Sequence, residues 1–230
     1  AHLPYGDKSA EAIKSYSVKI TEFLMTQHCK AIVIACNTAS AVGFKAVQKT
    51  FKHPELVVNV IDPVSERVAL RKGIDKVGVI ATKRTVSTKA YSKRLLKLRK
   101  ELKVSELATP LLAPMIEEGF FNNKISQTII NSYLSKKPLK DIQALILGCT
   151  HYPLIESEIH NYYGKGVEIF DSAKIVAENL KEVLSKNKLL KSKGKGNYEF
   201  YVSDYTSSFE QTAKIFFKEK IKLNLYQLWK

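Results

Sequence analysis

Two thiols occupy matching places in this sequence, each where an apolar segment ends. "AIVIAC" ends at Cys36 and "ALILGC" ends at Cys149. Side chains that donate and accept hydrogen bonds follow the two thiols directly: Asn37, Thr38, Thr150 and His151. A thiol can donate a proton and its thiolate can accept one, so two thiols can work together as an acid and a base. The repeated context indicates that both cysteines do chemistry.

The elements that must position these thiols alternate along the chain. Apolar strands are expected at 31–36, 56–61, 76–81, 144–149 and 167–170. Amphipathic helices are expected at 40–51, 64–72, 85–100, 125–136 and 173–186, with a first helix starting near Lys8 or Ser9. This alternation is typical of an α/β fold with mainly parallel sheets. Ligands bind beyond the carboxyl ends of such strands, where a helix N-terminus also makes a thiol more acidic.

The composition is that of a folded globular protein, with 230 residues of which 45% are hydrophobic and 26% charged. No apolar run approaches the ~18 residues of a membrane span, and no secretory leader is evident, so we expect a cytoplasmic protein without a membrane partner. The formal charge of +15 is dispersed along the chain and indicates no specific nucleic-acid partner. Three cysteines, an odd number, argue against a disulfide framework.

Several kinds of chemistry use thiols, and the spacing discriminates among them. Metal sites and dithiol redox centres favour C-x-x-C, which is absent, and no nucleotide-binding loop or pyridoxal motif is evident, so neither metal nor cofactor is expected. Nucleophilic catalysis by Cys149 with His151 would leave Cys36 unexplained. Racemisation or epimerisation needs one proton-transferring group on each face of a carbon and explains the pair best. Cys29 has no such context and is interpreted as a small core residue.

Three motifs resemble those of the glutamate racemases, cofactor-independent enzymes that make D-glutamate for bacterial peptidoglycan. They are "PYG" at 4–6, "ACNTASA" at 35–41 and "GCTHYPL" at 148–154, in the family's order and spacing. The resemblance implies that Cys36 acts on D-glutamate and Cys149 on L-glutamate, without a cofactor. It also implies a set of substrate-binding residues: Tyr5, Gly6, Asn37, Thr38, Thr150 and His151. The oligomeric state is left open, a homodimer included.

Further candidates come from the same resemblance and from local position. Glu117 resembles an acidic residue that the family places close to the second cysteine and its histidine. Thr82 and Thr85 lie where a strand gives way to a helix and are secondary candidates for substrate contact. His151 is placed to tune Cys149 or to pass it a proton. In the related aspartate racemases, an acidic residue typically stands where this chain has His151.

The resemblance also implies two similar α/β lobes, each with a mainly parallel sheet flanked by helices, and an active site in the cleft between them. The first lobe would comprise residues 1–62 together with 171–230, and the second lobe residues 63–170. Each lobe would then supply one thiol. Opening and closing of the cleft would control access and exclude water during proton transfer.

The sequence departs from the family pattern at its start. Glutamate racemases begin with a strand and an "FDSG"-type turn, and no such segment occurs here, so we expect that the natural protein carries it ahead of this chain or that the protein is naturally truncated. The Lys- and Gly-rich segment 187–200 is interpreted as an exposed connection. Two alternatives stay open: a racemase of aspartate or a hydantoin-like substrate, and a basic, catalytically inactive binding protein of racemase descent.

Overall fold

The computed structural model describes residues 4–206, 209–210, 213–214, 217 and 221–229. Within these residues the strands pair in three sheets, all of them parallel. The first sheet pairs β1 (Ile32–Ile34) with β2 (Val57–Asn59). The second has the order β4-β3-β5-β6 and consists of Lys103–Ala108, Lys76–Ala81, Ala144–Gly148 and Glu168–Phe170. The third pairs β7 (Phe200–Val202) with β8 (Leu223–Leu225).

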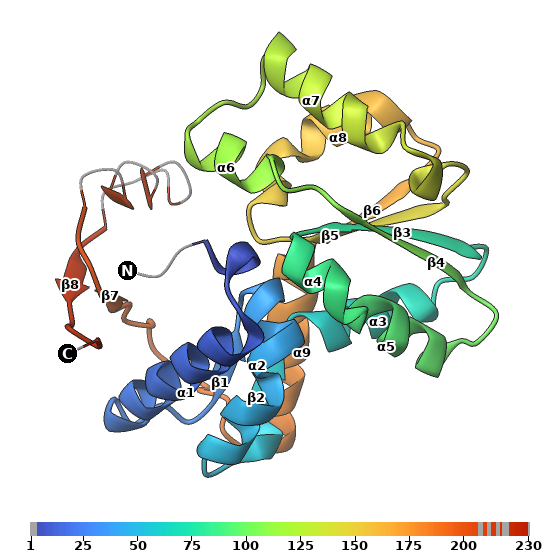
Figure 1. Ribbon diagram of the computed structural model, residues 1–230. Helices are drawn as coiled ribbons and strands as arrows, with labels where there is room; N and C mark the ends of the chain where they lie inside the picture. The colour runs from blue at the N-terminus through green and yellow to red at the C-terminus, as the bar shows by residue number, and fades with distance from the viewer. Residues whose placement is uncertain (1–3, 207–208, 211–212, 215–216, 218–220, 230) are drawn as a thin grey trace.

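The helices gather around the first two sheets as separate groups (Figure 1). Those drawn near β1 and β2 are α1 (Ala10–Thr26), α2 (Asn37–Thr50) and α9 (Ser172–Lys186). On one side of the four-stranded sheet lie α3 (Ile61–Ala69), α4 (Lys83–Thr88) and α5 (Ala90–Leu98). On its other side lie α6 (Leu112–Glu117), α7 (Lys124–Leu134) and α8 (Glu156–Tyr163). Short 3-10 helices add four turns to the described chain: Tyr5–Asp7, Pro54–Leu56, Lys137–Leu139 and Tyr152–Ile155.

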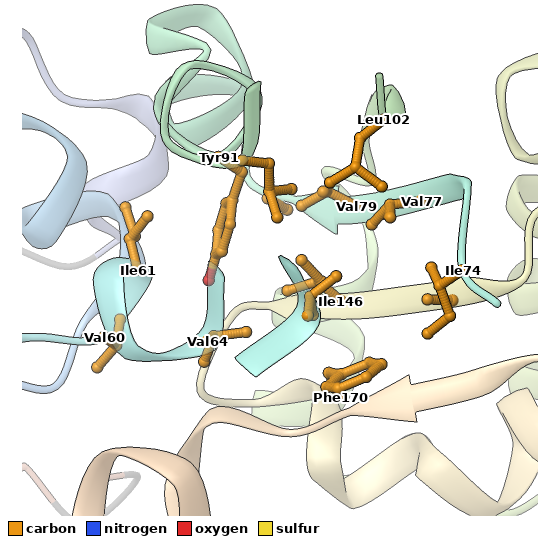
Figure 2. Close-up of a cluster of buried hydrophobic side chains, with 14 of the residues drawn as sticks. Val60, Ile61, Val64, Ile74, Val77, Val79, Tyr91, Leu102, Ile146 and Phe170 are labelled. Carbon is orange, nitrogen blue, oxygen red and sulfur yellow. The ribbon is translucent and has the colours of Figure 1, made fainter. Parts of the chain in front are cut away.

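The core follows from the continuous apolar sequences of β3 and β5. Side chains alternate between the two faces of a strand, so helices on both faces bury both sets. Val77, Val79 and Ile146 pack on one face with residues of α3 and α5, as Figure 2 shows in part. Ile80 and Leu145 belong to the cluster on the opposite face, with residues of α6, α7 and α8. The strands that carry the site are therefore fixed by packing from both sides.

The expected strands are all present, although several are shorter; the segment 31–36, for example, forms a strand only over Ile32–Ile34. Four of the described strands and α-helices were not predicted: β4, β8, α6 and α8. The helix expected at 85–100 is two helices, because Lys89 adopts a left-handed conformation with φ 53°. Helix α2 begins at Asn37, three residues earlier than expected. The segment 187–200 is largely exposed, as predicted.

The α/β fold with two lobes is confirmed, while the lobe boundaries near residues 62 and 171 stay a prediction. Helix α9 packs against α3 and also against β2. The cluster around β3 includes Val58, which lies in β2 of the first sheet, and Val60, which follows that strand. The two sheets thus share part of one apolar core. In the described part of the chain, every helix is too short or too polar to cross a membrane.

Candidate active site

One pocket of about 180 Å³ brings together both thiols and all six predicted substrate-binding residues. Its lining includes Tyr5, Gly6, Cys36, Asn37, Thr38, Cys149, Thr150 and His151. Of the further candidates, Thr82 and Glu117 also line the pocket, whereas Thr85 does not. Larger pockets occur elsewhere on the molecule, but they contain neither Cys36 nor Cys149. We therefore take the smaller pocket, where the chemistry gathers, as the candidate active site.

Cys36 is held at the junction of β1 and α2. It is the N-cap residue of α2, with extended backbone, and its Sγ accepts the backbone N–H of Ala39 at 3.5 Å. The next turn is fastened to both strands, because the Ser40 hydroxyl donates to the Ile34 carbonyl at 2.9 Å and accepts the Val60 N–H at 3.3 Å. The thiol is thereby fixed beside the N-terminus of the helix.

Removal from water sets the protonation of Cys36. Burial raises the pKa of this thiol, and the Ala39 N–H, which stabilises the thiolate, offsets only part of that effect. Negative charge on Cys149 raises the Cys36 pKa further. The expectation of a more acidic thiol at the helix N-terminus is therefore wrong for Cys36, since burial outweighs the helix. In the unliganded pocket Cys36 is favoured as the neutral thiol, ready to donate a proton.

Cys149 follows directly after Gly148, the last residue of β5, and is buried. The strand end fits closely against β3: a Cβ atom on Gly148 would lie 2.8 Å from the backbone oxygen of Ile80 and 2.9 Å from Cβ of Ala81. Only glycine fits without displacing backbone there. This close approach fixes the position from which Cys149 enters the pocket.

A line of three side chains leads away from the second thiol. Cys149 Sγ lies 3.4 Å from Nδ1 of His151, and Nε2 of His151 lies 3.0 Å from Oε1 of Glu117. Burial disfavours charge on the imidazole, but the hydrogen bonds to Cys149 and Glu117 outweigh it and raise the His151 pKa to about 9. His151 is therefore an imidazolium at neutral pH, with one N–H toward the sulfur and one toward the carboxylate. The predicted proximity of Glu117 to His151 is confirmed, and Glu117 lines the same pocket as Cys149.

Three threonine hydroxyls join α2 to the start of α4. Thr38 Oγ1 lies 2.9 Å from Oγ1 of Thr82 and 3.2 Å from Oγ1 of Thr85, and the last two oxygens are 3.0 Å apart. Thr38 and Thr85 are buried, whereas Thr82 also caps α4 by accepting the Thr85 N–H. The hydroxyls form a closed ring of contacts between segments 44 and 47 residues apart.

The turn that carries Tyr5 and Gly6 docks against the same helix start. A Cβ on Gly6 would lie 3.0 Å from Cβ of Thr82, and Arg84 Nε donates to the carbonyl of Lys8 at 3.0 Å. Burial, followed by the nearby Cys36, raises the pKa of Tyr5, so its phenol stays a hydrogen-bond donor. Thr150 also lines the pocket and is exposed.

Tyr91 is a residue beside the site that the sequence did not single out. Its hydroxyl donates to Oδ1 of Asn37 at 2.6 Å. In sequence Tyr91 reads as an apolar core position of an amphipathic helix, and it is indeed fully buried. The contact with Asn37, 54 residues away, depends on tertiary packing and leaves no local signal. Among the described residues, no cluster of three or more His, Cys, Asp or Glu side chains is arranged to hold a metal.

Comparisons with known proteins agree on one family. The family described as Asp/Glu/Hydantoin racemase matches residues 2–180. The glutamate racemase of Geobacter metallireducens is 37% identical over 229 residues, covering 99% of this chain and 84% of that protein. That of Thermoanaerobacter sp. is 39% identical over 220 residues, covering 96% and 81%.

Solved structures agree as well. Glutamate racemase from Francisella tularensis, crystallised with D-glutamate, has a TM-score of 0.91 at 35% identity and covers 99% of this chain and 85% of its own. The RacE1 isoform from Bacillus anthracis has a TM-score of 0.89 at 33% identity, with coverage of 98% and 84%. The chain belongs to the Asp/Glu/hydantoin racemase family and is an isomerase of the amino-acid racemase class. The resemblance to the glutamate racemases within it, first noted from three short motifs, is confirmed.

Proposed function

We propose that this protein interconverts L- and D-glutamate by proton transfer between two thiols, and that it supplies D-glutamate for peptidoglycan in the cytoplasm. The observation that carries the proposal is the single pocket lined by both Cys36 and Cys149, which come from the carboxyl ends of strands in different sheets. Relatives named glutamate racemases match over nearly the whole chain and support glutamate as the substrate.

The proposed reaction exchanges one proton for another at Cα. With L-glutamate, Cys149 as thiolate removes the α-proton and becomes a thiol, while the Cys36 thiol gives its proton to the opposite face of Cα and becomes a thiolate. The product is D-glutamate, and the reverse reaction starts from that protonation state. The raised pKa of Cys36 supports its starting role as the donor in the L-to-D direction.

The difficult step is removing a weakly acidic proton from Cα without pyridoxal. As the proton leaves, charge moves onto the α-carboxylate, which becomes enolate-like, so donors aimed at this carboxylate stabilise the transition state. The N-terminus of α2 offers backbone N–H groups, and Asn37 and Thr38 add side chains that line the pocket. We assign substrate binding to these groups, together with Tyr5, Gly6, Thr150 and His151.

His151 and Glu117 are proposed to assist Cys149 in proton transfer. The imidazolium donates toward the sulfur at 3.4 Å, and Glu117 at 3.0 Å keeps the imidazole charged. The N–H of the imidazolium faces the sulfur and can hydrogen-bond to it or pass it a proton.

The test measures deuterium incorporation at Cα and the configuration of the product in the same experiment. The protein is incubated with L-glutamate in deuterated water, and D-glutamate and α-deuterium are measured over time. Wild type is expected to produce D-glutamate deuterated at Cα. Cys36→Ser and Cys149→Ser are each expected to slow racemisation by about a hundredfold to ten-thousandfold, the range for loss of a general acid or base. Cys29→Ser is the matched control, because Cys29 lies in a separate pocket, and its rate is expected to be unchanged.

Other outcomes would contradict the proposal. Faster turnover of aspartate than of glutamate would identify a different substrate within the same family. A folded wild-type protein that exchanges no α-proton would defeat racemisation and favour a binding role. Full activity in either Cys36→Ser or Cys149→Ser would eliminate the two-thiol mechanism.

A further inference from the structure

The side-chain amide of Asn37 is bonded at one end only. Its Oδ1 accepts the Tyr91 hydroxyl at 2.6 Å, whereas its Nδ2 is closed off from solvent and has no hydrogen-bond partner among the described residues. Asn37 is 2% exposed and lines the pocket beside Cys36. A buried amide donor without a partner is costly, so native proteins rarely leave one unless a ligand satisfies it.

Tyr91 reaches this amide from the other side of the interface between the sheets. It lies in α5, and Figure 2 shows its ring extending from that helix past Ile61, with the hydroxyl at the far end. The ring also lies against the strand that carries the second thiol, because a Cβ on Gly148 would be 3.4 Å from Cε2 of Tyr91. The ring is completely buried, which leaves its hydroxyl little freedom to move.

The hydrogen bond from Tyr91 holds the Asn37 amide in one orientation. Burial, followed by the charges of Glu106 and Cys149, raises the pKa of Tyr91 far above its ordinary value, so the hydroxyl keeps its proton at any working pH. The neutral phenol donates its proton to Oδ1, the acceptor atom of this amide, at 2.6 Å. Oδ1 and Nδ2 are bonded to the same carbon and point in different directions. Because Oδ1 faces Tyr91, Nδ2 points away from Tyr91.

We propose that Tyr91 is a positioning residue that fixes the Asn37 amide so that its NH₂ group donates to a carboxylate of the substrate. This inference rests on the proposed function and adds to it the residue that orients the Asn37 amide. The carbonyl end of the amide is engaged by the protein, so the donor end is what the site offers. A carboxylate is the acceptor that a glutamate substrate brings.

Tyr91→Phe tests this with the smallest change, since the ring stays and only the hydroxyl is lost. Binding of D-glutamate is measured by calorimetry, and kcat and KM are measured in both directions. Kd and KM are expected to rise about fivefold to twentyfold, a partial loss of one hydrogen bond to a charged group, while kcat changes less. Tyr133→Phe is the matched control: Tyr133 is another buried tyrosine, its hydroxyl accepts the Leu111 N–H, and its loss is expected to leave Kd within twofold.

Two further variants separate positioning from general support of the fold. In an Asn37→Ala background, adding Tyr91→Phe is expected to change Kd by less than twofold, because the amide it orients is gone. Asn37→Asp retains an acceptor for Tyr91 but replaces the donor with a carboxylate, so D-glutamate binding is expected to fall more than in Tyr91→Phe. This variant keeps the test decisive even if Tyr91→Phe folds poorly.

The outcomes distinguish this inference from the function beneath it. Wild-type protein that binds D-glutamate without exchanging the α-proton would defeat the racemase proposal and leave the Kd comparison fully readable. Unchanged Kd in Tyr91→Phe, or an equal effect of Tyr91→Phe with and without Asn37, would overturn the positioning role. Wild-type protein that binds no D-glutamate would overturn both.

Discussion

Glu117 and His151 form a close ion pair at the edge of the pocket, with Oε1 of the glutamate 3.0 Å from Nε2 of the histidine. The pair joins α6 to the segment that follows β5, and its histidine faces Cys149 through the other ring nitrogen. The imidazole of His151 thus links the carboxylate of Glu117 to the sulfur of Cys149. The side chains of Glu117 and His151 are partly exposed, at 33% and 25%, so solvent screening reduces but does not remove the attraction between them.

Glu117→Gln should lower the pKa of His151, because it removes the negative charge that favours the imidazolium. An opposite charge at this distance shifts a pKa by about 1 to 3 units. The measurement is an NMR titration of the His151 ring protons, which should titrate near 9 in wild type and at least about one unit lower in the variant. Glu156→Gln is the control, since Glu156 pairs with His160 instead. An unchanged His151 titration in Glu117→Gln would show that the pair is not electrostatically coupled.

The stability of the fold should depend on pH through His151. The pKa of a histidine in an unfolded chain is about 6.5, whereas the pKa of His151 is about 9 in the folded protein, so folding favours the charged form. The stabilisation is therefore complete below pH 6.5 and is lost as pH rises through 9. His151→Gln should cost more unfolding free energy at pH 6 than at pH 9.5, by about 3 kcal/mol at most. Urea titrations at both pH values measure it, and an equal cost at the two values would contradict the raised pKa.

The three mutually bonded hydroxyls of Thr38, Thr82 and Thr85, here called the threonine ring, should increase the free energy of unfolding. Thr85→Val keeps the shape of the side chain, but it removes a hydroxyl that contacts both Thr38 and Thr82. Thr38 and Thr82 keep their contact with each other, so the cost is that of two lost hydrogen bonds, about 1 to 3 kcal/mol in total, which urea denaturation should report. Thr128→Val provides the matched control, because the Thr128 hydroxyl is exposed and bonds only its own helix. A cost below about 0.5 kcal/mol, the range of ordinary surface changes, would mean that the ring has no structural weight.

Gly148→Ala should impair both folding and activity. The added methyl would meet the Ile80 backbone oxygen at 2.8 Å, and backbone cannot move aside as a flexible side chain could. Overpacking of this kind costs about 1 to 3 kcal/mol and should shift Cys149, which follows directly. Gly166→Ala is the comparison, since its nearest neighbour would be the Tyr163 oxygen at 3.5 Å. The checks are the thermal midpoint and kcat; equal behaviour of the two variants would refute the close fit at β5.

The parts of the fold that could be predicted are those with a local signal. Cys36 and Cys149 follow apolar strands, so their places at strand ends could be predicted from the pattern. The two strands lie in different sheets, so the convergence of the thiols was implied only by the resemblance of the motifs to the family. Strand β4 was missed because "KVSELA" is polar and only partly buried. Helix α8 was missed because buried Glu158 interrupts its apolar face; this carboxylate is held by the hydroxyl of Ser126, another distant partner.

In the site, too, some features have a local sequence signal and others depend on tertiary packing. Residue types and spacing predicted which groups line the pocket, but their protonation depends on burial, which sequence does not reveal. Cys36 illustrates this, since its place at a helix N-terminus was predicted and the direction of its pKa was not. Tyr91 could not be predicted for a different reason. Its hydroxyl contacts an amide 54 residues away, and the sequence does not distinguish such a tyrosine from an ordinary core aromatic.

The left-handed residue between α4 and α5 has a geometric consequence for the pocket. In one continuous helix, Thr85 and Tyr91 would point in directions roughly 120° apart, at 3.6 residues per turn. With the chain redirected at Lys89, Thr85 reaches Thr38 and Tyr91 reaches Asn37, two successive residues of α2. Because of this kink, side chains from two consecutive helices contact the first turn of α2. The residue at the kink is a lysine, although the left-handed conformation is unfavourable for a residue with a Cβ.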